Sequence, residues 1–356
     1  MTTKRLKVAG AGAGYYARFH VEAWKSIGRV DYAGICDADP DKARGFAQRL
    51  GLAGSHAGLA EMLDELQPDL LDIVTPPESH LEVAKAAFER GIAVVCQKPL
   101  APSLAEAIKM VEQAEQHGVP LFVHENFRFR PWFRETADLL RQNRIGTVHA
   151  LSFRLRPGDG QGADAYLHRQ PYFRRMERFL VHETAIHFID TFRFLLGEIS
   201  AVTSRLRRLN PGIAGEDAGY IIFEFENGST ALFDGNRLNT HPADNPALTM
   251  GEMWLEGSAG VLRLDGSARL WWAPHGQPET EHHYPRHEQL FAGGAVHALQ
   301  ARLADCLLDN TTMENSGRDY LANIRVEEAV YRSNAEGRRI TLERPTRSTP
   351  TTRTTI

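Results

Sequence analysis

The chain has 356 residues, of which 42% are hydrophobic and 24% are charged, and its formal net charge at pH 7 is −4. This length suits about two globular domains of roughly 150 residues each. A slightly acidic chain offers no basic field, which excludes nucleic acid and anionic membranes as main partners. Because the start lacks a signal-peptide pattern and no apolar run has membrane length, we expect a cytoplasmic protein that acts on small molecules.

The three cysteines, Cys36, Cys96 and Cys306, lie far apart in apolar stretches and lack C-x-x-C spacing. Cysteine in such surroundings behaves as a small hydrophobic residue. We therefore expect neither a disulfide framework nor a zinc site built on thiolates.

The first chemical motif is a glycine-rich turn at residues 12–17, with the sequence Gly-Ala-Gly-Tyr-Tyr-Ala. An apolar stretch typical of a strand precedes it, and a helical pattern follows. In this G-x-G-x-x-A form, Gly12 permits the tight turn and Gly14 lets the backbone approach a pyrophosphate. The motif predicts a dinucleotide site at the N-terminus of a helix that Tyr15 and Tyr16 open.

Asp37 closes the apolar stretch at residues 32–36 and indicates which dinucleotide binds. A carboxylate at this point accepts hydrogen bonds from a ribose 2′-hydroxyl and repels a 2′-phosphate, so we expect NAD. The alternative is that Asp37 only begins a turn and caps the next helix. Lys42 and Arg44, further along, leave some room for NADP.

Residues 6–123 alternate short apolar stretches with amphipathic segments. This alternation predicts a doubly wound parallel sheet, an α/β Rossmann domain over residues 1–127. Right-handed crossovers place the carboxyl ends of its strands at one edge, where ligands bind. The expected strands are residues 6–11, 32–36, 70–74, 92–96 and 119–123, and the expected helices are residues 43–50, 59–66, 80–90 and 103–117.

Three loops at that edge carry further candidates. The prolines of Thr75-Pro76-Pro77-Glu78-Ser79-His80 fix the loop and expose carbonyl groups beside a cofactor, although a rigid turn with a helix-capping histidine explains it equally well. Gln97-Lys98-Pro99 places a lysine directly after a buried strand, where an ordinary solvated lysine is the alternative. The segment 124–131, His-Glu-Asn-Phe-Arg-Phe-Arg-Pro, ends the alternating pattern.

Residues 128–344 change to longer strands of alternating polarity and predict an α+β domain with a mixed, mostly antiparallel sheet. Asn227-Gly228 indicates a hairpin turn within it. So large a sheet needs cover on both faces, which favours a homodimer or homotetramer through this sheet. The Thr-rich residues 345–356 are expected to form a disordered tail. The expected strands are residues 147–156, 200–209, 218–226, 229–237, 250–256 and 260–264, and the expected helices are residues 132–142, 295–308 and 319–334.

Residues 178–196 have the pattern of one long buried helix, because apolar side chains cover most of its circumference. Glu183, His187 and Asp190 are spaced i, i+4 and i+7 and form a polar stripe on one face. Burying such groups is costly unless they are hydrogen-bonded or line a site, so we favour acid–base chemistry over a core Glu-His pair. A metal ion on Glu183 and His187 is a third interpretation, but beyond His182 or a remote histidine no further ligand is evident, and we expect none.

Together, these motifs resemble those of the Gfo/Idh/MocA oxidoreductases over residues 4–340. The glycine-rich fingerprint, the Thr-Pro-Pro-x-x-His loop, the Glu-Lys-Pro motif and the Asp-x-x-x-His helix of that family all have counterparts here. Two positions depart from the family pattern, since Gln97 replaces a glutamate and Glu183 replaces an aspartate. The stretches HENFRFRPWFR and LRPGDGQGADAYLHRQPYFR are similar to a D-apiose dehydrogenase branch of the family.

The resemblance implies NAD-dependent oxidation of a sugar carbinol. In this chemistry His187 takes the hydroxyl proton, Glu183 orients its imidazole, and Lys98 bridges nicotinamide and substrate. An inositol dehydrogenase that forms a keto-sugar, or a regulator that binds NAD and sugar without turnover, is the alternative. The expected cofactor contacts are Gly12, Gly14, Tyr15, Tyr16, Asp37, Thr75, Pro76, Pro77, His80, Gln97 and Lys98. The sugar-binding candidates, chosen because they lie around the expected site, are Asn126, Arg128, Arg156, Asp164, Tyr172 and His187.

Overall fold

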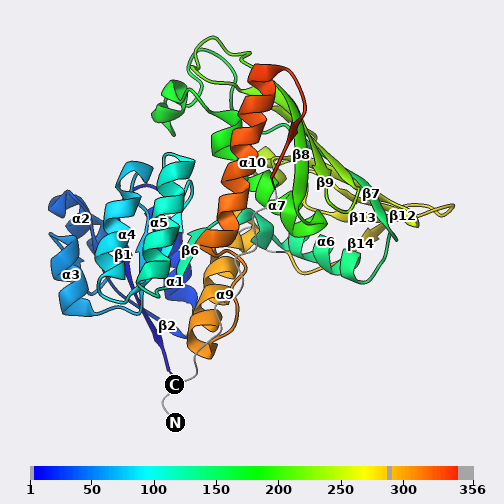
Figure 1. Ribbon diagram of the computed structural model, residues 1–356. Helices are drawn as coiled ribbons and strands as arrows, with labels where there is room; N and C mark the ends of the chain where they lie inside the picture. Colours follow the sequence, from blue (N-terminus) through cyan, green and yellow to red (C-terminus); the bar gives the residue numbers. More distant parts are fainter. Residues whose placement is uncertain (1–3, 287–290, 344–356) are drawn as a thin grey trace.

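The computed structural model describes residues 4–286 and 291–343, so the tail expected at residues 345–356 lies outside the described part. Two sheets lie beside each other, with the long helix α10 (Gly317–Glu336) between them (Figure 1). The first sheet has six strands and the second has nine. This arrangement confirms the expected combination of an α/β layer and an α+β layer.

The first sheet is parallel throughout and has the strand order β3-β2-β1-β4-β5-β6. Its central reversal, with β1 between β2 and β4, is the switch point at which doubly wound sheets bind dinucleotides. β3 was not expected, because two residues are too few to give a pattern. The strands are β1 (Leu6–Ala11), β2 (Val30–Cys36), β3 (Ser55–His56), β4 (Leu70–Ile73), β5 (Ala93–Gln97) and β6 (Leu121–His124).

Helices cover both faces of the first sheet. Ala9 on β1 packs into the core below the helices of one face, whereas Val8 packs toward the other face together with Trp24 of α1 and Leu299 of α9. A division of the chain at residue 127 stays a prediction, and α9, far along the sequence, crosses it to return to the first sheet. The helices are α1 (Ala17–Ser26), α2 (Pro40–Leu50), α3 (Leu59–Leu66), α4 (His80–Phe88), α5 (Leu104–Gln116) and α9 (Ala295–Asp309).

The second sheet is mixed and mostly antiparallel, as expected, with β7 and β10 as its one parallel pair among the described residues. Its strand order is β14-β13-β12-β11-β7-β10-β9-β8-β15. Asn227-Gly228 joins β9 to β10 as predicted, and Gly228 has φ +86°. The strands are β7 (Val148–Leu155), β8 (Ile199–Arg207), β9 (Ala218–Phe225), β10 (Thr230–Asn236), β11 (Gly251–Gly257), β12 (Gly260–Leu264), β13 (Leu270–Pro274), β14 (Thr280–His282) and β15 (Ile340–Thr341).

The segment expected as one helix over residues 178–196 is instead two different helices. A π-helix spans Leu180–Ala185, and the α-helix α7 spans Ile186–Leu196. Residues 183 and 187 still lie about one turn apart across this junction, so their spacing alone does not decide which partner each side chain has. The remaining helices are α6 (Pro131–Arg141), α8 (Pro246–Thr249) and short 3-10 turns at Pro77–Ser79, Phe127–Phe129, Pro171–Arg175 and Phe291–Gly294.

Candidate active site

The turn between β1 and α1 has the geometry that a bound pyrophosphate needs. Gly12 has φ +100°, and a Cβ atom there would lie 2.4 Å from the backbone oxygen of Val74, so only glycine fits. A Cβ atom on Gly14 would meet nothing within 4 Å, which leaves its backbone open to a ligand. No side chain caps the N-terminus of α1. Its free N–H groups therefore suit a phosphate group.

Asp37 follows β2 and lies beside this turn. Its Oδ2 accepts hydrogen bonds from the backbone N–H of Ala13 at 2.8 Å and from Nζ of Lys42 at 3.1 Å. Burial raises the pKa of the carboxyl group, but these hydrogen bonds, the Asp39 N–H and the charge of Lys42 outweigh it and lower the pKa. An ionised carboxylate at the fingerprint turn is the group that an adenosine ribose requires.

The Thr75 loop borders the same turn, but His80 is not part of the cofactor surface. Thr75 reaches the fingerprint, since its Cγ2 would lie 3.0 Å from a Cβ atom on Gly12. His80 is fully buried, with Nε2 at 2.9 Å from the Thr75 oxygen and Nδ1 at 3.1 Å from the Leu100 oxygen. This histidine holds two loops together, so the expectation that His80 contacts the cofactor is corrected.

Lys98 leaves the end of β5 and pairs with the π-helix. Its Nζ donates to the backbone oxygen of Glu183 at 2.7 Å and to the Glu183 carboxylate at 3.0 Å. Arg237 contacts the same carboxylate at 3.6 Å and also donates to Thr184 Oγ1 at 2.7 Å. Burial raises the pKa of Glu183, but the charges of Lys98 and Arg237 outweigh it and lower the pKa to about 2. Glu183 is therefore ionised and committed to Lys98.

Glu125, not Glu183, is the partner of His187. Nδ1 of His187 lies 2.7 Å and 2.8 Å from the two carboxylate oxygens of Glu125, which follows β6 directly. Phe127 stacks on the imidazole, with centroids 3.9 Å apart and planes at 4°. The expected role of Glu183 in orienting His187 is thus wrong, because the Glu183 carboxylate bonds to Lys98 while Nδ1 of His187 bonds to Glu125.

The environment of the Glu125–His187 pair disfavours charge on both groups. Glu125 is 0% exposed, and burial raises its pKa to about 7. Burial, aided by the charge of Lys98, lowers the pKa of His187 well below its usual value. The two groups share one proton, and the position of this proton decides which imidazole nitrogen of His187 carries a hydrogen. Nε2 of His187 has no protein partner within the described residues. This nitrogen is therefore the available base.

Further polar groups link the two halves of the site. The amide of Asn126 donates to the hydroxyl of Tyr16 at 3.2 Å, which joins the fingerprint helix to the end of β6. Tyr172 is 56% exposed, so its phenol can meet a ligand. Tyr15 and Asp164 are exposed, and Pro76 and Pro77 lie at the surface of the Thr75 loop.

The chain matches two family descriptions in succession. Residues 6–125 match an oxidoreductase family with an NAD-binding Rossmann fold, and residues 133–263 match the GFO/IDH/MocA C-terminal domain. The chain belongs to the Gfo/Idh/MocA oxidoreductase family. It is accordingly an oxidoreductase with NAD as its cofactor, as the fingerprint predicted.

Within this family, two curated relatives match the chain along most of its length. A D-apiose dehydrogenase from Paraburkholderia graminis is 34% identical over 352 residues, which are 96% of this chain and 91% of the relative. A D-apiose dehydrogenase from Rhizobium rhizogenes is 30% identical and covers 96% of this chain and 98% of the relative. An oxidoreductase from Agrobacterium radiobacter, solved with NAD+, L-tartaric acid and magnesium, has a TM-score of 0.87 at 29% identity and covers 95% of this chain and 98% of its own.

Two of the sugar-binding candidates prove to be internal supports of this Gfo/Idh/MocA fold. Arg128 is 5% exposed and forms two hydrogen bonds, of 2.7 Å and 2.6 Å, with the buried carboxylate of Asp190. Arg156 donates to the carboxylate of Asp234 at 2.6 Å and to two backbone oxygens. Each guanidinium group is thus held inside the fold by two or three of its five N–H donors, so both assignments to the sugar are corrected.

Sequence reasoning missed Glu125 and Arg237. Glu125 carries a weak signal, because it follows a buried strand at the ligand edge of a parallel sheet. Arg237 carries none, since it directly follows β10 of the second sheet and reaches the site only through the fold. It is 1% exposed and held by Asp159 at 2.6 Å.

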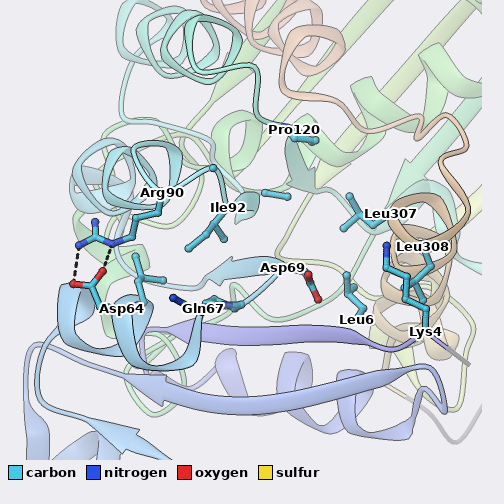
Figure 2. A pocket seen from close by; sticks show the side chains of 14 residues that line it. Lys4, Leu6, Asp64, Gln67, Asp69, Arg90, Ile92, Pro120, Leu307 and Leu308 are labelled. Carbon is cyan, nitrogen blue, oxygen red and sulfur yellow. Dashed lines mark hydrogen bonds and ion pairs between the residues drawn. The ribbon is translucent and has the colours of Figure 1, made fainter. Parts of the chain in front are cut away.

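A cavity of about 680 Å³ lies away from this site. Figure 2 shows it at the opposite edge of the first sheet, between Leu6, Ile92 and Leu308, with the Arg90–Asp64 ion pair at its rim. The chemistry is not located there, because dinucleotides bind at the carboxyl ends of the strands. Across residues 4–286 and 291–343, no group of three potential metal ligands occurs, and no helix is long and apolar enough to cross a membrane.

Proposed function

We propose that this enzyme oxidises a sugar, an aldose with D-apiose as the first candidate, at its anomeric carbon and releases the lactone. The observation that carries the proposal is the convergence of Lys98, bonded to Glu183, and His187, bonded to Glu125, near the fingerprint turn. Likeness to the two D-apiose dehydrogenases over 96% of the chain supports the choice of sugar.

His187 is the base of the proposed reaction. When Glu125 is ionised, Nδ1–H of His187 donates to it and leaves the lone pair of Nε2 free to take a hydroxyl proton. The buried carboxylate then stabilises the imidazolium that forms. Stacking on Phe127 keeps the ring in this orientation.

Lys98 positions the hydroxyl oxygen. An ammonium group has three N–H donors, and the backbone oxygen and carboxylate of Glu183 accept two of them. The third points to no acceptor within the described residues and can donate to the alkoxide oxygen that develops as the proton leaves. Bound NAD supplies an acceptor for the hydride that departs from the carbon.

Oxidation of a cyclic aldose in this way is balanced in one step. The anomeric C–H bond breaks with its electron pair going to the nicotinamide, the hydroxyl proton goes to His187, and a C=O bond forms to give the lactone. Among the described residues, no serine or cysteine is hydrogen-bonded to the side chains of Lys98, Glu183, Glu125 or His187. An aldehyde-to-acid reaction needs a covalent or hydrated intermediate. The inositol-type alternative breaks a ring C–H bond and forms a keto-sugar.

Time-resolved NMR of a labelled aldose with NAD distinguishes these products. We expect the lactone as the first signal, followed by slow opening to the acid. A keto-sugar as the first product contradicts oxidation at the anomeric carbon and supports the inositol-type reaction. Absence of turnover across aldoses, inositols and amino sugars, with NAD still bound, supports the non-catalytic regulator.

We also propose that the protein forms a homodimer or homotetramer through the second sheet. Trp254, Leu232 and Ile222 are 47%, 38% and 40% exposed, and strand pairing through Ser152 places them in one row across β11, β7, β10 and β9. Such an exposed apolar row suits an isologous contact with a second copy. Light scattering should give a larger mass for the natural chain than for Leu232→Lys. A cytoplasmic location stays a prediction.

A further inference from the structure

A buried chain of hydrogen bonds lies behind Lys98. The backbone N–H of Lys98 donates to Oε1 of Gln97 at 2.7 Å, and Nε2 of Gln97 lies 3.3 Å from Nε2 of His20. Nδ1 of His20 lies 2.9 Å from Asp72, which also accepts from Nε1 of Trp24 at 2.8 Å. His20 and Asp72 are both 0% exposed. The proposed mechanism uses none of these groups.

The partners fix the orientation of every group in this chain. Because Oε1 of Gln97 accepts from Lys98, the amide NH₂ of Gln97 is the group that faces His20. An amide NH₂ only donates, so Nε2 of His20 must be bare and accept. A carboxylate only accepts, so Nδ1 of His20 must carry the hydrogen that goes to Asp72. His20 is therefore the neutral Nδ1–H tautomer.

Two aromatic side chains hold the His20 ring in place. His124 stacks on it with centroids 3.8 Å apart. Tyr16, from the fingerprint turn, meets the ring edge-on at 5.3 Å. Asp72 is the acidic side chain in contact with His20, and Gln97 places a neutral amide where a second carboxylate could stand.

We infer that His20 is a positioning residue: held as its Nδ1–H tautomer by Asp72, it orients the Gln97 amide and thereby fixes the backbone from which Lys98 enters the active site. The role of Lys98 in turnover rests on the proposed function, but the tautomer and the orientation of the amide do not. The chain also gives a reason for glutamine at position 97, since a glutamate there would face the lone pair of Nε2.

Asp72→Asn should reverse the direction of the hydrogen bonds in this chain. The asparagine oxygen, in the place of Oδ2, keeps the hydrogen bond from Trp24, and its NH₂ group, in the place of Oδ1, lies 3.0 Å from Nδ1 of His20. Nδ1 must then be bare, Nε2 must carry the hydrogen, and the Gln97 amide has to turn its oxygen away from Lys98. We expect kcat to fall about tenfold, the scale of one lost hydrogen bond, while the Kd for NAD changes little.

Adding Gln97→Glu to Asp72→Asn restores every partner. Nε2–H of His20 then donates to one oxygen of Glu at position 97, and the other oxygen accepts from Lys98. The double variant should therefore regain most of the lost kcat. The single variant Gln97→Glu, in contrast, places a carboxylate on each side of the His20 ring. A purely structural role does not predict that two defects cancel.

Selective ¹⁵N labelling of histidine gives a readout that does not depend on turnover. NMR should show His20 protonated at Nδ1 in the natural chain, at Nε2 in Asp72→Asn and in the double variant, and at both nitrogens in Gln97→Glu. An Nε2–H tautomer in the natural chain overturns the inference, and so does a double variant no faster than Asp72→Asn. If Asp72→Asn does not fold, Gln97→Glu still decides, because a bare Nε2 in that variant contradicts the assignment. Turnover lost in Lys98→Met but unchanged in all three variants rejects the inference and leaves the proposed function standing.

Discussion

Glu125 and His187 are 62 residues apart in the sequence, yet their side chains meet at 2.7 Å. Glu125 follows the last strand of the first sheet, and His187 lies in the first turn of α7, which packs under the second sheet. The base of the proposed reaction is thus assembled from both halves of the chain. Glu125, which sets the protonation of this base, belongs to the same half of the chain as the fingerprint turn.

Glu125→Gln should inactivate the base without disturbing the cofactor. The glutamine NH₂ donates to Nδ1 of His187 and moves the hydrogen to Nε2, so kcat should fall by about 10² or more. Stopped-flow measurement of NADH formation gives kcat, and fluorescence titration gives the Kd for NAD. Glu61→Gln, at an exposed position on α3, is the matched control. Near-normal turnover in Glu125→Gln contradicts the assigned tautomer.

The pH dependence of kcat/KM should report the Glu125–His187 pair. Because burial raises the pKa of Glu125 to about 7, its carboxyl group keeps a proton at lower pH, donates it to Nδ1 and leaves Nε2 protonated. Activity should therefore rise with pH up to about 7 and then level off, with the apparent pKa belonging to the pair. A profile that is flat between about pH 5.5 and 8 excludes this pair as the base.

Lys98→Met should lower kcat by about 10² or more, because the donor to the developing alkoxide is lost while the stem is kept. It leaves the Glu183 carboxylate with Arg237 at 3.6 Å, so the fold should survive. The comparison is steady-state kinetics beside Lys85→Met, an exposed lysine on α4. Equal kcat values in the two variants would show that Lys98 is an ordinary solvated lysine without a role in turnover.

Arg128→Met separates a structural arginine from a sugar ligand. The substitution leaves the carboxylate of Asp190 buried without its ion-pair partner, which costs about 3–5 kcal/mol of unfolding free energy. Urea unfolding should show this loss, and the exposed Arg44→Met should not. A variant of normal stability with a raised KM for the sugar restores the role that the sequence suggested.

Asp37 should set the preference for NAD over NADP. Asp37→Ser with a neighbouring arginine should relax it, as the ratio of kcat/KM for the two cofactors will show. The carboxylate also accepts from Ala13 at the fingerprint turn, so we expect some loss of affinity for both cofactors. If the natural enzyme has the higher kcat/KM with NADP, Asp37 is not a ribose contact.

The sequence was sufficient for features that depend on neighbouring residues. The fingerprint turn and Lys98 both follow buried strands, and the order of strands and helices alone places them at one edge of the sheet. The prediction for Glu183 was wrong because an i, i+4 spacing places two residues on one helix face without showing which partner each side chain has, and this carboxylate bonds to Lys98.

Partners distant in the sequence could not be predicted. Arg128 and Arg156 were chosen as sugar ligands for their place in loops, but the buried Asp190 and the β10 residue Asp234 that hold them come from other elements. Glu125 was passed over for the same reason, since only the packing of α7 against the 3-10 turn at Phe127–Phe129 shows which histidine it contacts.

Turnover of D-apiose with NAD, followed by the near-ultraviolet absorbance of NADH in the natural chain and in His187→Ala, tests the central claim most directly. The account predicts steady NADH formation by the natural chain and a rate lower by about 10² or more in His187→Ala, with NAD still bound by both. Equal rates in the two proteins, or no NADH from the natural chain with any aldose, would contradict it.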